Sequence, residues 1–176
     1  MIALKVVLTG RPGSGKSTII AKVADSLKRS GWAVGGVVSP EVNQGGVRVG
    51  FSIVDIMSGR RGCLATALTS EGPRFGRYHV NLRDIEDIGV KAIRDSLATS
   101  DLTVIDEIGP MELKSPAFDR VVREAFDGEK SLLASVHWTL AKLYAEYKSI
   151  KIVTVTPENR GYLADKAEQL FLGEGA

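Results

Sequence analysis

The residues best suited to chemistry lie near the beginning of the sequence, where glycines, a lysine and hydroxyl side chains follow one another at fixed spacing. This run comprises Gly10, Arg11, Pro12, Gly13, Ser14, Gly15, Lys16, Ser17 and Thr18. It fits the pattern G-x-x-x-x-G-K-[ST], in which glycines let successive backbone N–H groups point into one concavity that holds phosphate. A lysine at this position reaches the terminal phosphates of a nucleotide, and the hydroxyl after it binds Mg²⁺. We therefore expect residues 10–18 to bind a nucleotide, with Lys16 acting in catalysis and Ser17 as a ligand of Mg²⁺.

A second group of residues is an apolar run that ends in two adjacent carboxylates. It comprises Leu102, Thr103, Val104, Ile105, Asp106, Glu107, Ile108 and Gly109. Two carboxylates at a strand end are costly unless a cation or water satisfies them, and the lysine motif elsewhere in the chain favours a cation. We expect Asp106 to bind Mg²⁺ and Glu107 to orient an attacking water or accept its proton. The whole run belongs to the expected nucleotide-binding residues.

Residues 106–109 can also be read as D-x-x-G, a switch motif of GTPases. Two features of the sequence oppose this reading. No N-K-x-D sequence, which reads guanine, occurs in the chain, and the span from Lys16 to Asp106 holds at least one more strand–helix unit than a Ras-like layout. We therefore favour the class of hydrolases that has an additional central strand and a catalytic glutamate and that resembles RecA-like ATPases. No motif indicates a base preference.

The elements that must position these residues alternate between strand and helix along the chain. Apolar runs that predict buried strands lie at 4–9, 33–38, 102–105, 131–136 and 151–155. Helical spacing of apolar residues predicts helices that end at Gly31, span 84–99, begin at Ser115-Pro116, cover 140–147 and begin at Thr156-Pro157. About five such alternations predict an α/β three-layer sandwich on a mostly parallel, five-stranded P-loop core. In such sheets ligands bind where the strands end.

The stretch from Ser39 onward breaks this alternation. Glycine-rich turns separate strand-like pieces at 47–56 and 62–68, and no helical period appears there. This pattern predicts an antiparallel hairpin addition around residues 39–68. We expect residues 71–82 to form an ordered loop that contains Arg74 and Arg77.

Composition narrows the class of protein. The chain has 176 residues, with 23 Lys and Arg against 21 Asp and Glu, which suits one domain over residues 1–176 and gives no strong nucleic-acid signal. The single cysteine, Cys63, excludes an internal disulfide and a cysteine-rich zinc site. No apolar run reaches the roughly 20 residues that span a membrane, and residues 1–9 do not look like a signal peptide. We expect a cytoplasmic monomer that has no membrane partner.

Two blocks of sequence resemble a known family. Residues 106–113 read D-E-I-G-P-M-E-L, and residues 153–160 read V-T-V-T-P-E-N-R. Both are similar to blocks of a small nucleoside-triphosphatase family named for thermophiles and for a cancer-related human member. The resemblance covers essentially the whole chain, with residues 39–83 carrying it weakly. At one position this chain differs, since Gly161 stands where such proteins often have aspartate.

The resemblance implies a Mg²⁺-dependent hydrolase that converts ATP, GTP and other nucleoside triphosphates to the diphosphate and phosphate. It also implies that Asn159 and Arg160, which follow the last strand, contact the nucleotide. Arg160 is suited to binding a phosphate or stacking on a base.

Other side chains have two readings each. Glu112 either supports Glu107 or is a solvated loop acid, and His137 either senses phosphate through water or is structural. The middle of the chain offers four candidates for an arginine that stabilises the transition state, although solvated arginines without such a role are commoner. These candidates are Arg60, Arg61, Arg74 and Arg77. We expect Trp32 and Trp138 to be packing residues, with a place beside the nucleotide base as the alternative for Trp138.

Two other functions fit the same motifs. A nucleoside or nucleotide kinase would use the same phosphate loop and pass the phosphoryl group to an acceptor held by the middle region. A nucleotide-gated binding module would use slow hydrolysis as a timer. Release of phosphate without any acceptor favours the hydrolase, and strict dependence on an acceptor favours the kinase.

Overall fold

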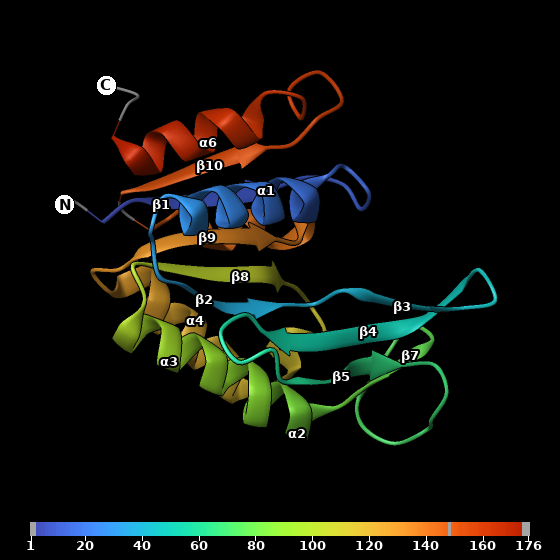
Figure 1. Ribbon diagram of the computed structural model, residues 1–176. Coiled ribbons are helices and arrows are strands. Elements are labelled where there is room, and N and C mark those ends of the chain that lie inside the picture. Colours follow the sequence, from blue (N-terminus) through green and yellow to red (C-terminus); the bar gives the residue numbers. More distant parts are fainter. Residues whose placement is uncertain (1–2, 148, 174–176) are drawn as a thin grey trace.

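The computed structural model describes residues 3–147 and 149–173, and in them one mixed sheet runs through the centre of the molecule (Figure 1). Its strands are β1 (Lys5–Thr9), β2 (Val34–Val38), β3 (Glu41–Gln44), β4 (Val47–Asp55), β5 (Arg61–Thr66), β6 (Arg74–Phe75), β7 (Tyr78–Val80), β8 (Leu102–Ile108), β9 (Ser131–Val136) and β10 (Ile150–Thr154). The strand order is β10-β1-β9-β8-β2-β4-β5-β7-β6, and β3 pairs with β4.

Helices cover both faces of this sheet. They are α1 (Lys16–Arg29), α2 (Leu82–Asp84), α3 (Lys91–Thr99), α4 (Pro116–Asp127), α5 (Ala141–Tyr144) and α6 (Leu163–Leu172), with a π-helical turn η1 (Ile85–Val90) and 3₁₀ turns η2 (Glu112–Lys114) and η3 (Trp138–Leu140). Helices α1 and α6 lie on one face, and α3 and α4 lie on the other. Each face buries its own apolar cluster, as the sequence pattern predicted for three layers. No helix of the described residues is both long and apolar enough to cross a membrane.

Five neighbouring strands form the parallel core. Strand β1 pairs in parallel with β10 and β9, and β8 pairs in parallel with β9 and β2. Strand β9 therefore separates β1, which leads into the glycine-rich loop, from β8, which ends in the two carboxylates. This order agrees with the class that has an additional central strand. It confirms the predicted α/β fold with a mostly parallel sheet.

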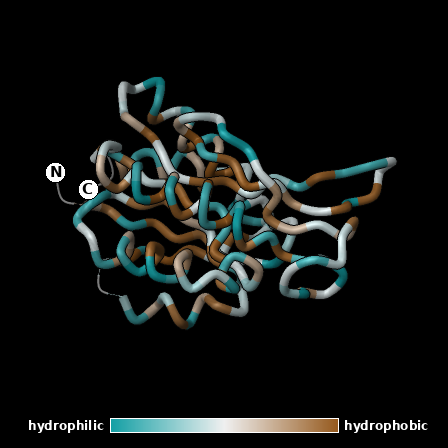
Figure 2. The backbone as a smooth tube through the Cα atoms, turned by 90° about the horizontal axis from the view of Figure 1, so that it is seen from below, coloured by the Kyte–Doolittle hydropathy of each residue, from teal (hydrophilic) through white to brown (hydrophobic). Residues whose placement is uncertain are grey.

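The antiparallel addition extends the sheet beyond β2. Strand β2 pairs antiparallel with β4, and β4 pairs antiparallel with β3 and β5. Figure 2 shows mostly hydrophobic segments in the centre and the β3–β4 hairpin projecting from the body. We call strands β3 to β7 the extension. The expected hairpins around residues 39–68 are present, but the expected loop at 71–82 contains β6 and β7, because Gly76 turns the chain at φ +58°.

Three expected helices have different bounds. The helix expected over 84–99 includes the π-helical turn η1, and α5 ends at Tyr144. The last helix begins at Leu163 and not at Thr156-Pro157, because Asn159 holds the preceding residues in turns. Its side chain accepts a hydrogen bond from Thr156 N at 2.8 Å and donates one to Thr154 O at 2.8 Å. The start of α4 is confirmed, since Ser115 Oγ accepts from Phe118 N at 3.2 Å.

Candidate functional site

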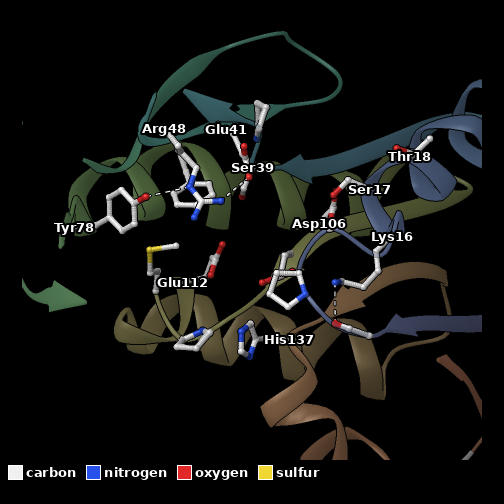
Figure 3. Close-up of a pocket in the computed structure, with 18 of the residues that line it drawn as sticks. Lys16, Ser17, Thr18, Ser39, Glu41, Arg48, Tyr78, Asp106, Glu112 and His137 are labelled. Atoms are coloured by element: carbon white, nitrogen blue, oxygen red, sulfur yellow. Dashed lines mark hydrogen bonds and ion pairs between the residues drawn. The ribbon is translucent and has the colours of Figure 1, made fainter. Parts of the chain in front are cut away.

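A cleft of about 520 Å³ lies between the loop after β1, the end of β8 and the extension (Figure 3). Its lining residues are Gly10, Pro12, Gly13, Gly15, Lys16, Ser17, Thr18, Ser39, Pro40, Glu41, Arg48, Phe51, Phe75, Tyr78, Asp106, Glu107, Pro110, Met111, Glu112 and His137. The parallel order of the core places the ends of β1 and β8 at one edge of the sheet. The structure thus brings Lys16, Ser17, Asp106 and Glu107 to one cleft.

The loop between β1 and α1 is built to surround an anion. Gly13 and Gly15 have φ values of +76° and +106°, which side chains with a Cβ rarely adopt. Gly15 caps α1 without a side-chain hydrogen bond, so the positive end of this helix is open to an incoming group. Lys16 is buried, and its Nζ donates to Gly10 O at 3.0 Å and to Arg11 O at 3.3 Å. The lysine is therefore held inside the loop, where a phosphate would replace these carbonyl contacts.

Two neighbouring carboxylates face this loop from the end of β8. Asp106 is only 7% exposed, and its Oδ1 accepts a hydrogen bond from the Ser135 hydroxyl on β9. Burial raises the pKa of Glu107, while the charge of Lys16 lowers it and the charge of Asp106 raises it further. The ammonium of Lys16 and the carboxylate of Glu107 are thus close enough to influence each other. The additional strand β9 fixes the orientation of Asp106.

Glu112 is a third acid in the cleft and is not the solvated loop acid that one reading allowed. It is 3% exposed, and its burial, with the charges of Glu107 and Asp106, raises its pKa to about 8. A Cβ placed on Gly109 would lie 2.8 Å from Glu112 Oε2 and 3.0 Å from Glu107 Oε1. The two glutamates therefore flank the same glycine, which has no side chain to separate them.

His137 lines the cleft at the end of β9. Its Nδ1 lies 2.7 Å from Thr139 Oγ1, a contact within the turn that follows the strand. Burial and the charge of Lys16 lower the pKa of His137, which keeps the imidazole neutral at pH 7.

Asn159 and Arg160 are beside the phosphate loop but do not line the cleft that the described residues form. Val155 N donates to Thr9 O at 2.7 Å, so the loop after β10 continues next to the end of β1. A Cβ on Gly15 would lie 3.9 Å from Cδ of Arg160. Asn159 holds its own turn, and the side chain of Arg160 lies close to Gly15 of the phosphate loop.

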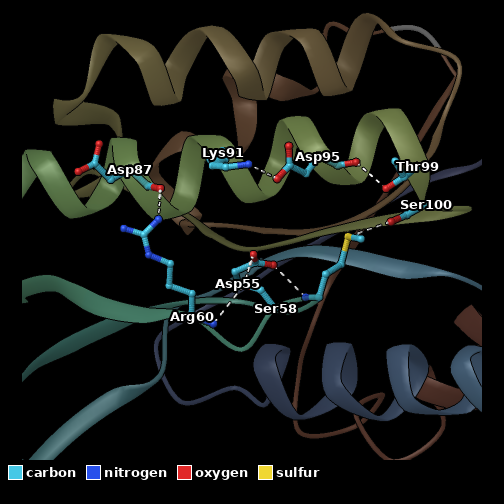
Figure 4. A network of polar contacts seen from close by, with 9 residues as sticks. Asp55, Ser58, Arg60, Asp87, Lys91, Asp95, Thr99 and Ser100 are labelled. Carbon is cyan, nitrogen blue, oxygen red and sulfur yellow. Dashed lines mark hydrogen bonds and ion pairs between the residues drawn. The ribbon is translucent and has the colours of Figure 1, made fainter.

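None of the four arginines proposed from the sequence lines the cleft formed by the described residues. Arg60 donates to Asp87 O at 3.2 Å and ties the extension to η1 (Figure 4). Arg61 donates to Ser52 Oγ at 3.3 Å, and Arg74 donates to Gly76 O at 2.8 Å. Arg77 is held near the cleft, where its Nη2 donates to Tyr78 Oη at 3.0 Å.

The arginine that does line the cleft is Arg48, which the sequence reasoning missed. Arg48 comes from β4 together with Phe51, and three other strands of the extension contribute Glu41 (β3), Phe75 (β6) and Tyr78 (β7). These residues form no sequence motif, and bulges in β3–β4 and β4–β5 break the alternation that would have placed them on one face.

The two tryptophans differ in how far their side chains pack against the rest of the protein. Trp32 packs edge-on against Phe171 with ring centroids 6.3 Å apart, as a packing residue should. Trp138 lies in the turn η3 and is 55% exposed, so it is not a buried packing residue, and its ring centroid lies 6.0 Å from that of His137.

Together the sheet order, the glycine-rich loop and the paired carboxylates define a P-loop protein of the nucleoside-triphosphatase class. A family model described as NTPase matches residues 5–167, and the chain belongs to this family. It is similar to Nucleoside-triphosphatase THEP1 of Methanothermobacter thermautotrophicus, with 47% identity over 89% of this chain and 90% of that protein. The relative of the same name from Methanosarcina acetivorans is 44% identical over 96% and 97% of the two chains.

Two solved structures agree with this fold. The crystal structure of THEP1 from the hyperthermophile Aquifex aeolicus superposes with a TM-score of 0.84 at 25% identity, covering 96% of this chain and 99% of that one. The solution structure of a human cancer-related nucleoside triphosphatase gives a TM-score of 0.81 at 34% identity, covering 97% and 98%. The family resemblance inferred from residues 106–113 and 153–160 is thereby confirmed.

Proposed function

We propose that this protein hydrolyses nucleoside triphosphates, in the presence of Mg²⁺, to the diphosphate and inorganic phosphate. One observation carries the proposal: Lys16, Ser17, Asp106 and Glu107, which come from two distant parts of the sequence, line the same cleft. The names of the similar proteins support the same activity. ATP, GTP and other nucleoside triphosphates are the proposed substrates.

The phosphate loop supplies binding. Backbone N–H groups of residues 10–18 and the start of α1 surround the phosphates, because the glycines leave no side chain in the way. Lys16 transfers its hydrogen bonds from the Gly10 and Arg11 carbonyls to the terminal phosphates. Arg160, whose side chain lies close to Gly15, contacts the nucleotide beyond the phosphates, and Asn159 holds the turn that carries it.

The residues present fit a Mg²⁺ ion. Ser17 and Asp106 both line the cleft and offer the hard oxygen atoms that this ion prefers. The described residues contain no group of three or more His, Cys, Asp or Glu side chains that could hold a metal alone. Ser17 and Asp106 would therefore hold the ion together with substrate phosphates and water, which is common for Mg²⁺. When bound, the ion neutralises charge on the phosphate oxygens.

Glu107 orients the attacking water and accepts its proton. Burial raises the pKa of the Glu107 carboxyl group above its ordinary value while the charge of Lys16 lowers it, and a raised pKa makes this carboxylate a better proton acceptor. The water oxygen bonds to the γ-phosphorus, the bond from that phosphorus to the bridging oxygen breaks, and the diphosphate leaves. Catalysis is then mostly positioning and stabilisation of charge.

A panel of nucleoside triphosphates tests the proposal. Phosphate release is measured for each nucleotide with Mg²⁺ and with excess chelator, for the wild type and for Lys16→Ala. We expect phosphate release from several nucleotides without an added acceptor, and loss of this release with chelator. Lys16→Ala should have a higher KM and a lower kcat. Release that does not respond to the chelator, or wild-type kinetics in Lys16→Ala, would contradict the proposed site.

A further inference from the structure

The cleft continues past the carboxylates into a region that the hydrolysis of a triphosphate does not use. This region, which we call the extension end, is lined by Glu41, Arg48, Phe51, Phe75, Tyr78 and Met111. In Figure 3 the side chains of Arg48 and Tyr78 lie on the opposite side of the cleft from Lys16, and Glu112 lies between this pair and Lys16.

The side chains of the extension end suit a ligand that combines a flat ring with an anionic group such as a phosphate. Phe51 and Tyr78 meet edge to face with ring centroids 5.4 Å apart, and Phe75 presents a third ring that is partly exposed. Aromatic faces and the thioether of Met111 favour a flat heterocycle. The extension also supplies the cation Arg48 and the anion Glu41, which provide donors for a phosphate and an acceptor for a ring N–H.

Arg48 is held in place before any ligand binds. Its guanidinium carbon lies 5.1 Å from the centroid of the Phe51 ring. Its Nε donates to Tyr78 Oη at 3.0 Å, and its Nη1 forms an ion pair with Glu41 Oε1 at 2.7 Å. Positioning of this kind reduces the cost of ordering a long side chain when an anion binds.

If the proposed function holds, the extension end lies where a nucleophile would approach the γ-phosphorus of the bound triphosphate. If the phosphate loop holds the β-phosphate and Glu107 faces the γ-phosphate, the base of the donor nucleotide leaves the cleft on the other side of the loop. The attacking and leaving oxygens of a phosphoryl transfer lie roughly in line. A group bound at the extension end therefore approaches the γ-phosphorus from the side opposite the leaving diphosphate.

We propose that the extension end binds a nucleoside monophosphate, which accepts the γ-phosphoryl group in place of water. Its base packs against Phe51, Phe75 and Tyr78, and its phosphate pairs with Arg48. An oxygen of that phosphate bonds to the γ-phosphorus as the bond to the bridging oxygen of the donor breaks. One triphosphate and one monophosphate thus become two diphosphates, and the anionic oxygen has no proton to lose.

The test follows the label from a triphosphate labelled in its γ-phosphate. The purified protein is incubated with labelled ATP, Mg²⁺ and each of several nucleoside monophosphates or unphosphorylated nucleosides. The fraction of label in new diphosphate, relative to label released as phosphate, is the readout. Arg48→Met removes the charge and keeps the stem, Phe51→Ala removes the ring, and thermal unfolding reports whether each variant is folded. Arg83→Met is the matched control, because Arg83 is in the following helix with its side chain 86% exposed.

We expect at least one monophosphate to receive label in the wild type. At subsaturating acceptor, Arg48→Met should lower the transferred fraction about tenfold or more, since a charge-assisted contact is lost, and Arg83→Met should leave it unchanged. Phosphate release with no transfer to any monophosphate would overturn this inference and leave hydrolysis standing. Transfer to nucleosides alone, or equal loss of release and transfer in Arg48→Met, would also overturn it. Neither release nor transfer would instead contradict the proposed hydrolysis.

Discussion

Glu107 has an environment that suits a base, because burial and charge act on it in opposite directions. Burial and Asp106 raise its pKa, and the charge of Lys16 lowers it. Its neighbour Asp106 is differently placed, since the hydroxyl of Ser135 holds one of its oxygens. These different environments are consistent with the roles that we propose, Asp106 as a ligand of Mg²⁺ and Glu107 as the residue that meets the water.

Replacing Glu107 by Gln tests this assignment. The amide keeps the shape of the side chain but cannot accept the proton of water, so turnover should fall about 10²-fold or more. Nucleotide affinity should change little, because the phosphate loop is intact. Phosphate release and calorimetric titration with a nucleotide measure the two quantities. Glu129→Gln, at an exposed position outside the cleft, is the control. Wild-type turnover in Glu107→Gln would remove the glutamate from its proposed role.

Glu112 gives a pH-dependent prediction. Its pKa is raised from 4.5 to about 8, so the folded state holds a proton that the unfolded state releases. The protein should therefore lose stability as the pH rises from about 4.5 to about 8, by up to about 5 kcal/mol from this group. Glu112→Gln should lack this loss. Urea unfolding of the wild type and of Glu112→Gln, in the presence of chelator at pH 5 and pH 8.5, measures this loss of stability. If the free energy of unfolding changes with pH equally in both proteins, the prediction is wrong.

At the scale of elements, the sequence predicted those whose signals are local. The glycine-rich loop, the strand before Asp106 and the Ser115 cap were all readable, because spacing and residue type determine them. The extension end could not be predicted, because the bulges where β4 pairs with β3 and β5 decide which of its side chains, Arg48 and Phe51 among them, face the cleft. The turns before α6 were also missed, since the side chain of Asn159 competes with helix formation there.

The contact between β2 and β8 depends on a glycine. Gly36 has φ +107°, and a Cβ there would lie 2.0 Å from Val104 O on β8. Gly36→Ala should therefore lower the free energy of unfolding by more than about 3 kcal/mol, the scale of severe core substitutions, because β2 and β8 must move apart. Gly31→Ala is the control, since Gly31 has φ +88° but no described atom within 4 Å of the added carbon.

Denaturant unfolding of Gly36→Ala and Gly31→Ala separates close packing from backbone conformation. The control should lose only about 1 kcal/mol from the unfavourable φ. Equal losses in the two variants would mean that the approach of β2 to β8 is not what Gly36 provides.

At the scale of the whole molecule, three parts of the chain meet at one cleft. The loop after β1 supplies the glycines and Lys16, the end of β8 supplies the carboxylates, and the extension lines the far side. The first two meet because the core strands are parallel and end at one edge, which the sequence pattern predicts. The third depends on how an antiparallel sheet grows from β2, and no local pattern encodes its direction.

A structure of the protein with Mg²⁺ and a non-hydrolysable nucleoside-triphosphate analogue would show directly whether the glycine-rich loop and the paired carboxylates hold one nucleotide. We predict that the phosphates lie within residues 10–18 and that Lys16 Nζ leaves the Gly10 carbonyl to contact the terminal phosphates. Glu107 should then lie within hydrogen-bond distance of the γ-phosphate, directly or through one water. A triphosphate bound outside this cleft, or a γ-phosphate remote from Glu107, would contradict this prediction.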